Sequence, residues 1–187
     1  MQQMKNGSQA GFSYIDVMIA LVILLVGVLA LLAGISGSIV QTRSHEQQLL
    51  AKEVATSTME SIMSVKETDP VRLGWNAVGN VGSNLDANGV GQGVFLTGWQ
   101  AVYSDPGADE VIGTADDTGT VMPNLQRRIV ITDVCDPDRP SPTICNPAGT
   151  YKVKIRSVAV TVQYNVGGLL RQENLTTVLT DYSISNQ

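Results

Sequence analysis

The sequence predicts an α+β fold in which a long N-terminal helix packs on an antiparallel β-sheet head. Three observations predict it: the chain of 187 residues begins with a long apolar run, that run continues into a proline-free stretch of helix-forming residues, and strand-like segments occupy much of the remainder. We expect four segments in order. Residues 1–11 are a polar leader, 12–36 the apolar half of the helix, 37–68 its amphipathic half, and 69–187 a globular β head.

The apolar run is long enough to cross a membrane. Residues 17–35 carry no charged side chain. As a helix they rise about 28 Å, close to the ~30 Å hydrocarbon thickness of a bilayer. The first half of the helix is therefore expected to span a membrane once. One carboxylate, Asp16, lies at the start of this run, where a charge costs up to a few kcal/mol and commonly marks a function or a partner.

The second half of the helix is expected to lay one face on the head. From residue 37 to Lys66 the chain contains no proline, and apolar side chains recur at roughly helical spacing. The side chains expected on the buried face are Leu49, Leu50, Val54, Met59, Ile62 and Met63. One continuous helix from Phe12 to about Lys66 is therefore predicted, and the first proline, Pro70, ends it.

Strand-like runs follow a loop rich in glycine and asparagine. They cover residues 94–103, 126–134, 151–165 and 169–182. In the third run, alternate residues from Val158 to Tyr164 are apolar and the residues between them are small or polar, which is the pattern of a half-buried strand. Gly167 and Gly168 are expected to form the turn into the last strand.

The two cysteines, Cys135 and Cys145, flank a short proline-rich loop. Because a membrane export signal precedes them, we expect a disulfide formed in an oxidising compartment rather than a metal site. Closing so short a loop contributes on the order of 2–3 kcal/mol.

Charge and motifs exclude several classes of function. The net charge is −5 and the chain has no basic stripe, which argues against a nucleic-acid partner. The sequence has no Gly-x-Ser-x-Gly, His-Glu-x-x-His or phosphate-binding loop, and its single histidine, His45, cannot build more than one acid–base centre. We therefore expect a protein that is not an enzyme, and calcium is the one cofactor the sequence suggests.

The calcium hypothesis rests on one loop. From Asp105 to Asp117 the chain carries five acidic residues and no basic one. Against the EF-hand spacing, Asp105, Asp109 and Asp116 fall on positions 1, 5 and 12, but Glu110 stands at position 6, where glycine is expected. The candidate ligands are Asp105, Asp109, Asp116 and Asp117, and a solvated acidic loop is the alternative.

The N-terminus has two ordinary interpretations. A cleaved secretory signal peptide fits poorly, because the front carries only Lys5, the apolar stretch is too long and no clean Ala-x-Ala site follows. A plain single-pass anchor is physically acceptable, but it leaves the carboxylate of Asp16 unexplained.

A third interpretation uses both unusual features. The leader "MQQMKNGSQAG" followed by "FSYIDVMIALVIL" resembles the class III leader of type IV pilins and pseudopilins. In that family a dedicated peptidase cuts after the leader glycine, usually before phenylalanine, and the new N-terminus is methylated. The resemblance implies a type IV pilin fold and cleavage between Gly11 and Phe12. It also implies that Asp16, at the mature position where the family usually has Glu, pairs with the amino group of a neighbouring subunit's Phe12 and sets the register of assembly.

The last two strand-like runs also resemble the C-terminal hairpin of PilV-type minor pilins. Together the resemblances imply a minor pilin, made as a single-pass inner-membrane precursor with its head in the periplasm. It is then assembled into, or at the tip of, a type IV pilus at the cell surface. The implied partners are the major pilin, other minor pilins, the prepilin peptidase/methyltransferase, the inner-membrane assembly platform and the inner membrane before assembly. Two alternatives stay open: a minor pseudopilin of a type II secretion system, and an inner-membrane-anchored periplasmic calcium-binding module.

Overall fold

The structure is a computed structural model that describes residues 11, 13–67, 74–135 and 153–181. It comprises two compact units, Met1–Arg43 and Ser44–Gln187. Within the described residues the elements in chain order are one helix and four strands: α1 (Tyr14–Glu67), β1 (Gln100–Asp105), β2 (Thr118–Asp133), β3 (Ile155–Val166) and β4 (Leu169–Thr180). The chain is therefore α+β, with one long N-terminal helix and an antiparallel sheet.

Helix α1 spans 54 residues without interruption, as the absence of proline predicts. The expected end near Lys66 is confirmed, since the last helical residue is Glu67. Phe12, the expected first residue, and Pro70, the expected terminator, both lie outside the described residues.

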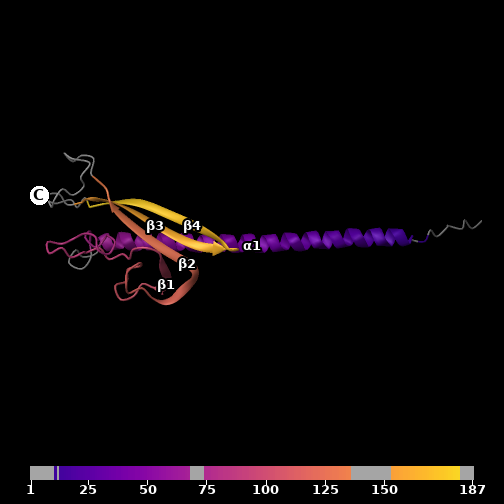
Figure 1. The fold of residues 1–187 in the computed structure, drawn as a ribbon, viewed down its shortest axis with the longest axis horizontal. Helices are drawn as coiled ribbons and strands as arrows, with labels where there is room; N and C mark the ends of the chain where they lie inside the picture. Colours follow the sequence, from indigo (N-terminus) through magenta and orange to yellow (C-terminus); the bar gives the residue numbers. More distant parts are fainter. Residues whose placement is uncertain (1–10, 12, 68–73, 136–152, 182–187) are drawn as a thin grey trace, which may run out of the picture. The chain divides into compact units, whose positions relative to one another are not determined.

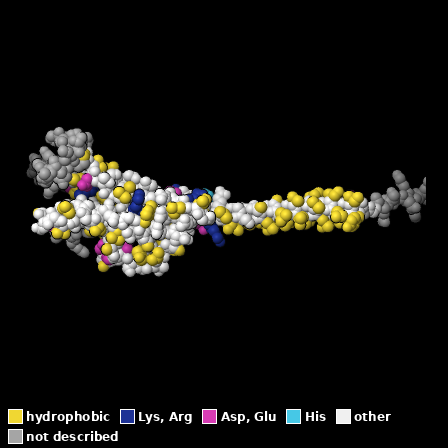
Figure 2. All heavy atoms as spheres, in the orientation of Figure 1, with side chains coloured by type: hydrophobic (Ala, Val, Ile, Leu, Met, Phe, Trp, Pro, Cys, Tyr) yellow, Lys and Arg dark blue, Asp and Glu magenta, His cyan; other side chains and the backbone are white. Residues whose placement is uncertain are grey.

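In the first unit the helix is apolar on every side. All of its described side chains from Ser13 to Arg43 are exposed, and Figure 2 shows hydrophobic side chains along the face of this part of the helix that is turned to the viewer. The most apolar 18 residues of α1 have a mean hydropathy of 3.1. By length and composition α1 is able to cross a membrane, which supports a single-pass membrane segment.

The second unit contains a four-stranded sheet in the order β1-β2-β3-β4, antiparallel throughout (Figure 1). Strands β3 and β4 pair continuously from Ile155 with Thr180 to Val166 with Leu169. The two-residue turn between them is Gly167–Gly168, as predicted, with φ angles of 58° and 83°. Both positive values belong to a type I′ turn, which glycine adopts without a steric penalty.

The core lies between the second half of α1 and one face of the sheet (Figure 1). On the helix, the buried residues are Ala51, Val54, Ala55, Thr58, Met59, Ile62 and Val65, which recur every three or four positions. On β3, the apolar members of the predicted alternation, from Val158 to Tyr164, are all buried, and Thr161 between them is buried as well. Phe95, from the loop before β1, is the largest fully buried side chain.

The prediction that Leu49 and Met63 lie on the buried face of the helix is wrong. Leu49 is 68% exposed and Met63 is 47% exposed. The buried face follows Ala51, Ala55 and Ile62, and each helical residue turns about 100° from the last, so Leu49 and Met63 point away from the sheet. Small alanines take the central positions of the face instead.

The first two strands also differ from their predicted ranges. Residues 94–99 are not in β1, because Phe95 forms an isolated bridge with Asn80 instead and Gly98 has a φ of 77°, which lies outside the β region. Strand β2 begins at Thr118, well before the predicted 126, although Pro123 interrupts the β pattern there. Pairing with β1 holds this part of β2 in the sheet despite the poor local propensity.

We predict that Ile62→Ala lowers the free energy of unfolding by about 2–5 kcal/mol, because it leaves a cavity between α1 and the sheet. Met63→Ala is the matched control on the next, exposed position and is expected to cost much less. Urea unfolding of the full chain in detergent, followed by the fluorescence of Trp75 and Trp99, measures both. Equal losses in the two variants would contradict the assigned helix face.

Candidate functional site

The predicted processing site lies just before α1. Gly11 is exposed and has no heavy atom within 4 Å of the position a Cβ would take, so no described residue shields it. The helix begins immediately afterwards: the carbonyl of Ser13 accepts hydrogen bonds from the N–H groups of Asp16 (2.9 Å) and Val17 (3.3 Å). Phe12, on the other side of the predicted scissile bond, lies outside the described residues.

Asp16 has a local role that the sequence interpretation missed. Its Oδ2 accepts a hydrogen bond from the backbone N–H of Ser13 at 3.3 Å. This is the carboxylate half of a capping box, in which an acid three residues into the helix satisfies a free N–H at the helix start. The negative charge also lies at the positive end of the helix dipole. The Ser-x-x-Asp spacing of Ser13 and Asp16 was the available signal.

The carboxylate of Asp16 also borders an apolar groove. A shallow depression of about 240 Å³ on the helix surface is lined by Asp16, Val17, Ala20, Leu21 and Leu24. No described residue forms an ion pair with Asp16. In an apolar environment, a carboxylate in this position would require a cation from outside the described chain.

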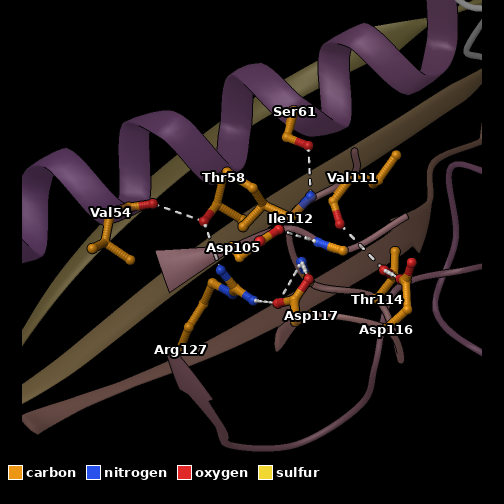
Figure 3. Close-up of polar contacts among 12 residues, drawn as sticks. Val54, Thr58, Ser61, Asp105, Val111, Ile112, Thr114, Asp116, Asp117 and Arg127 are labelled. Atoms are coloured by element: carbon orange, nitrogen blue, oxygen red, sulfur yellow. Dashed lines mark hydrogen bonds and ion pairs between the residues drawn. The ribbon is translucent and has the colours of Figure 1, made fainter. Parts of the chain in front are cut away.

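The acidic loop between β1 and β2 uses its carboxylates to bind its own backbone (Figure 3). Asp105 accepts from the N–H of Gly107 at 2.9 Å, and Asp109 accepts from the N–H of Val111 at 2.8 Å. Asp116 accepts from the N–H of Asp109 at 3.0 Å and from the hydroxyl of Thr114 at 2.6 Å. The Thr114 hydroxyl and the backbone N–H groups lower the pKa of Asp116. The loop is thus held by internal hydrogen bonds.

Asp117 forms a buried ion pair. Its Oδ2 lies 2.7 Å from Nη2 of Arg127 on β2, and the side chains are 8% and 2% exposed. Asp117 also accepts from the N–H of Gly113 at 3.0 Å. The guanidinium of Arg127 reaches the hydroxyl of Thr58 on α1 at 3.3 Å, which links helix, loop and sheet (Figure 3). The sequence interpretation missed this partner because Arg127 lies outside the loop and reaches it only through the pairing of β1 and β2.

The structure places the four candidate calcium ligands in one loop without forming a ligand set. Among the described residues, no group of three or more His, Cys, Asp or Glu side chains converges to hold a metal ion. Asp117 has Arg127 as its counter-charge, so a cation is not required to neutralise it. Calcium binding by Asp105, Asp109, Asp116 and Asp117 stays a prediction.

A second buried arginine, Arg156, connects the loop that follows α1 to the sheet. Arg156 on β3 is stacked on the ring of Trp75, 4.4 Å from its centroid, and donates to the carbonyls of Trp75 and Val78. It also pairs with Asp133 on β2 at 3.1 Å and donates to the side chain of Asn84 at 2.9 Å. Burial lowers the pKa of Arg156, and the hydrogen bond and charge of Asp133 oppose that effect. These contacts are structural, since they close the loop over the core.

Of the two cysteines, only Cys135 lies within the described residues. Cys135 is disulfide-bonded, and Cys145, its predicted partner, lies outside the described residues.

Comparisons with protein-family models, curated proteins and solved structures find no match to this chain. Any proposal about function must therefore be argued from the residues and their geometry.

We predict that Arg127→Met lowers the free energy of unfolding by about 3–5 kcal/mol, because it leaves the Asp117 carboxylate buried without its cation. The double variant with Asp117→Asn is expected to recover part of that loss, since an asparagine still accepts from the N–H of Gly113 and carries no charge. Urea unfolding of four chains, the wild type, the two single variants and the double variant, measures the coupling. A double variant no more stable than Arg127→Met would show that the ion pair is not the source of the effect.

Proposed function

We propose that this chain is a minor pilin, a structural subunit assembled through its N-terminal helix into a type IV pilus after leader cleavage and N-methylation. One observation supports the proposal most directly. An uninterrupted helix starts three residues after Gly11, is apolar on all sides from Val17 to Ile35, and contributes its second half to the buried core of an α+β head.

The apolar half of α1 needs an environment that water does not provide. Its large side chains, from Ile15 to Val40, remain roughly half exposed or more. Burying them would be worth about 25 cal/mol per Å² of apolar area, so the helix would occupy a bilayer or a bundle of similar helices. A minor pilin uses both environments in turn, because it waits in the inner membrane and then enters the filament core.

Asp16 is the residue proposed to specify assembly. A carboxylate at the start of an apolar helix is costly in a bilayer, so its presence argues for a cationic partner. In the proposed filament that partner is the N-terminal amino group of a neighbouring processed subunit. The capping bond to Ser13 uses one carboxylate oxygen, and the other oxygen is free to accept from that ammonium group.

The charge of Asp16 can be separated from its capping bond by substitution. We predict that Asp16→Asn, which still accepts from the N–H of Ser13, reduces incorporation into filaments about as strongly as Asp16→Ala. Asp16→Glu, which keeps the charge and introduces the residue usual in the family, should be incorporated at the wild-type level. The readout is the ratio of this subunit to major pilin in sheared filaments. Normal incorporation of Asp16→Asn would assign the residue to helix capping alone.

Processing is tested at the leader glycine. We predict that Gly11→Ala leaves uncleaved precursor in the membrane, whereas Gly7→Ala, the matched change within the leader, is processed normally. Mass spectrometry of the N-terminal peptide from the native host is the measurement. A wild-type chain that starts at N-methylated Phe12 supports a pilin or pseudopilin, and a chain that keeps Met1 in the membrane supports a plain anchor. Recovery in purified surface filaments, rather than with a secretion system, separates the pilin from the pseudopilin.

A further inference from the structure

The outer edge of strand β4 is unpaired among the described residues. Strand β4 is the last of the sheet and pairs with β3 at every position from Leu169 to Thr180. No backbone hydrogen bond joins its other side to any described residue. A strand in this position carries a row of free N–H and C=O groups that can accept another strand.

The turn determines which groups face outward. In a two-residue type I′ hairpin, the closing residues, here Val166 and Leu169, exchange both hydrogen bonds, and every second pair along the ladder does the same. The odd-numbered residues of β4 are therefore bonded to β3. The bond from the N–H of Asp181 to the carbonyl of Lys154, 2.8 Å, agrees with this alternation. The outward-facing backbone groups belong to Leu170, Gln172, Asn174, Thr176, Val178 and Thr180.

The two edges of the sheet are built differently. Strand β1 has six residues and two register shifts, features that discourage pairing with another strand. Strand β4 has 12 residues, no proline and no register shift. Its charges are confined to Arg171 and Glu173, and Glu173 accepts from Gln48 on α1 at 2.9 Å. The segment 174–180 is uncharged and rich in β-branched residues, and Val178 is 58% exposed.

We propose that the outer edge of β4 accepts an extended, uncharged strand from the head of a neighbouring subunit in the same assembly. The absence of charge along 174–180 favours an uncharged partner strand, since an unpaired charge would be desolvated there. The partner strand would be recognised through its backbone, and hydrogen bonds to alternate residues of β4 would hold the two strands together.

The size of the edge indicates why the partner is a neighbouring subunit. An added strand meets this chain along one sheet edge only, whereas stable independent interfaces bury ~1,200 Å² or more of total surface. A partner anchored beside this chain by its own apolar helix would be held at an effective concentration on the order of millimolar, at which weak pairing forms. This identification of the partner therefore rests on the proposed function.

Hydrogen exchange at residue resolution tests the pairing on the full chain. In detergent, the amides of Gln172, Asn174, Thr176 and Val178 should exchange fast, while the odd-numbered amides between them are slow. In assembled filaments, these even-numbered amides should become at least tenfold slower. The alternation is specific, because covering a sheet face would not protect alternate backbone groups selectively. Unchanged exchange in filaments, or protection already present in detergent, would overturn the proposal.

A substitution provides a second test of the strand pairing. Val178→Lys places a charge at the edge, and Thr132→Lys is the matched control at an exposed position of β2 that shares the same face. We expect Val178→Lys to abolish the protection of the even-numbered amides in filaments, and Thr132→Lys to leave it intact. Equal behaviour of the two variants would overturn the pairing.

The two proposals fail in different ways. A chain that begins at Phe12 and enters filaments but shows no change at the even-numbered amides refutes the edge pairing and leaves the pilin assignment standing. A chain absent from filaments refutes the pilin assignment, and with it the neighbouring subunit as the partner.

Discussion

The packing of one face of α1 on the sheet is the interaction on which the head depends. The face is built around Ala51 and Ala55, whose small side chains let the helix approach the strands closely, and around Ile62, which is fully buried. It meets the alternating valines of β3, and Phe95 closes the core from the loop before β1. The same helix continues towards the N-terminus as the apolar segment.

Buried arginines connect the loops to this core. Arg127 joins the acidic loop to Thr58 of α1, and Arg156 joins the loop after α1 to β2 through Asp133. Each guanidinium is almost fully buried, so each needs its carboxylate and its other hydrogen-bond acceptors to offset the loss of hydration. The four aspartates between β1 and β2 thus have a structural account in which backbone N–H groups, the Thr114 hydroxyl and one arginine are their partners. A calcium ion would add to a loop that is already held together.

The apolar half of α1 and the outer edge of β4 share a physical property. Both present groups that no described residue covers, the first its apolar side chains and the second its outward backbone N–H and C=O groups. In the proposed filament, neighbouring subunits cover both. Asp16 would then contribute specificity rather than stability, since its charge is compensated only where a partner presents an amino group at the correct position.

The sequence alone determined the features that depend on local periodicity. The length of α1, its apolar first half, the alternation on β3 and the Gly167–Gly168 turn all follow from spacing and from the residues that break or permit a helix or a strand. The tertiary structure decided what depends on contacts between distant residues. In the tertiary structure Ala51, and not Leu49, lies on the buried face of α1, and Arg127 forms an ion pair with Asp117. Strand β1 begins only after Gly98, and β2 includes Pro123. These outcomes were not predictable from local pattern, because each depends on which strand lies beside which, and no single segment carries that information.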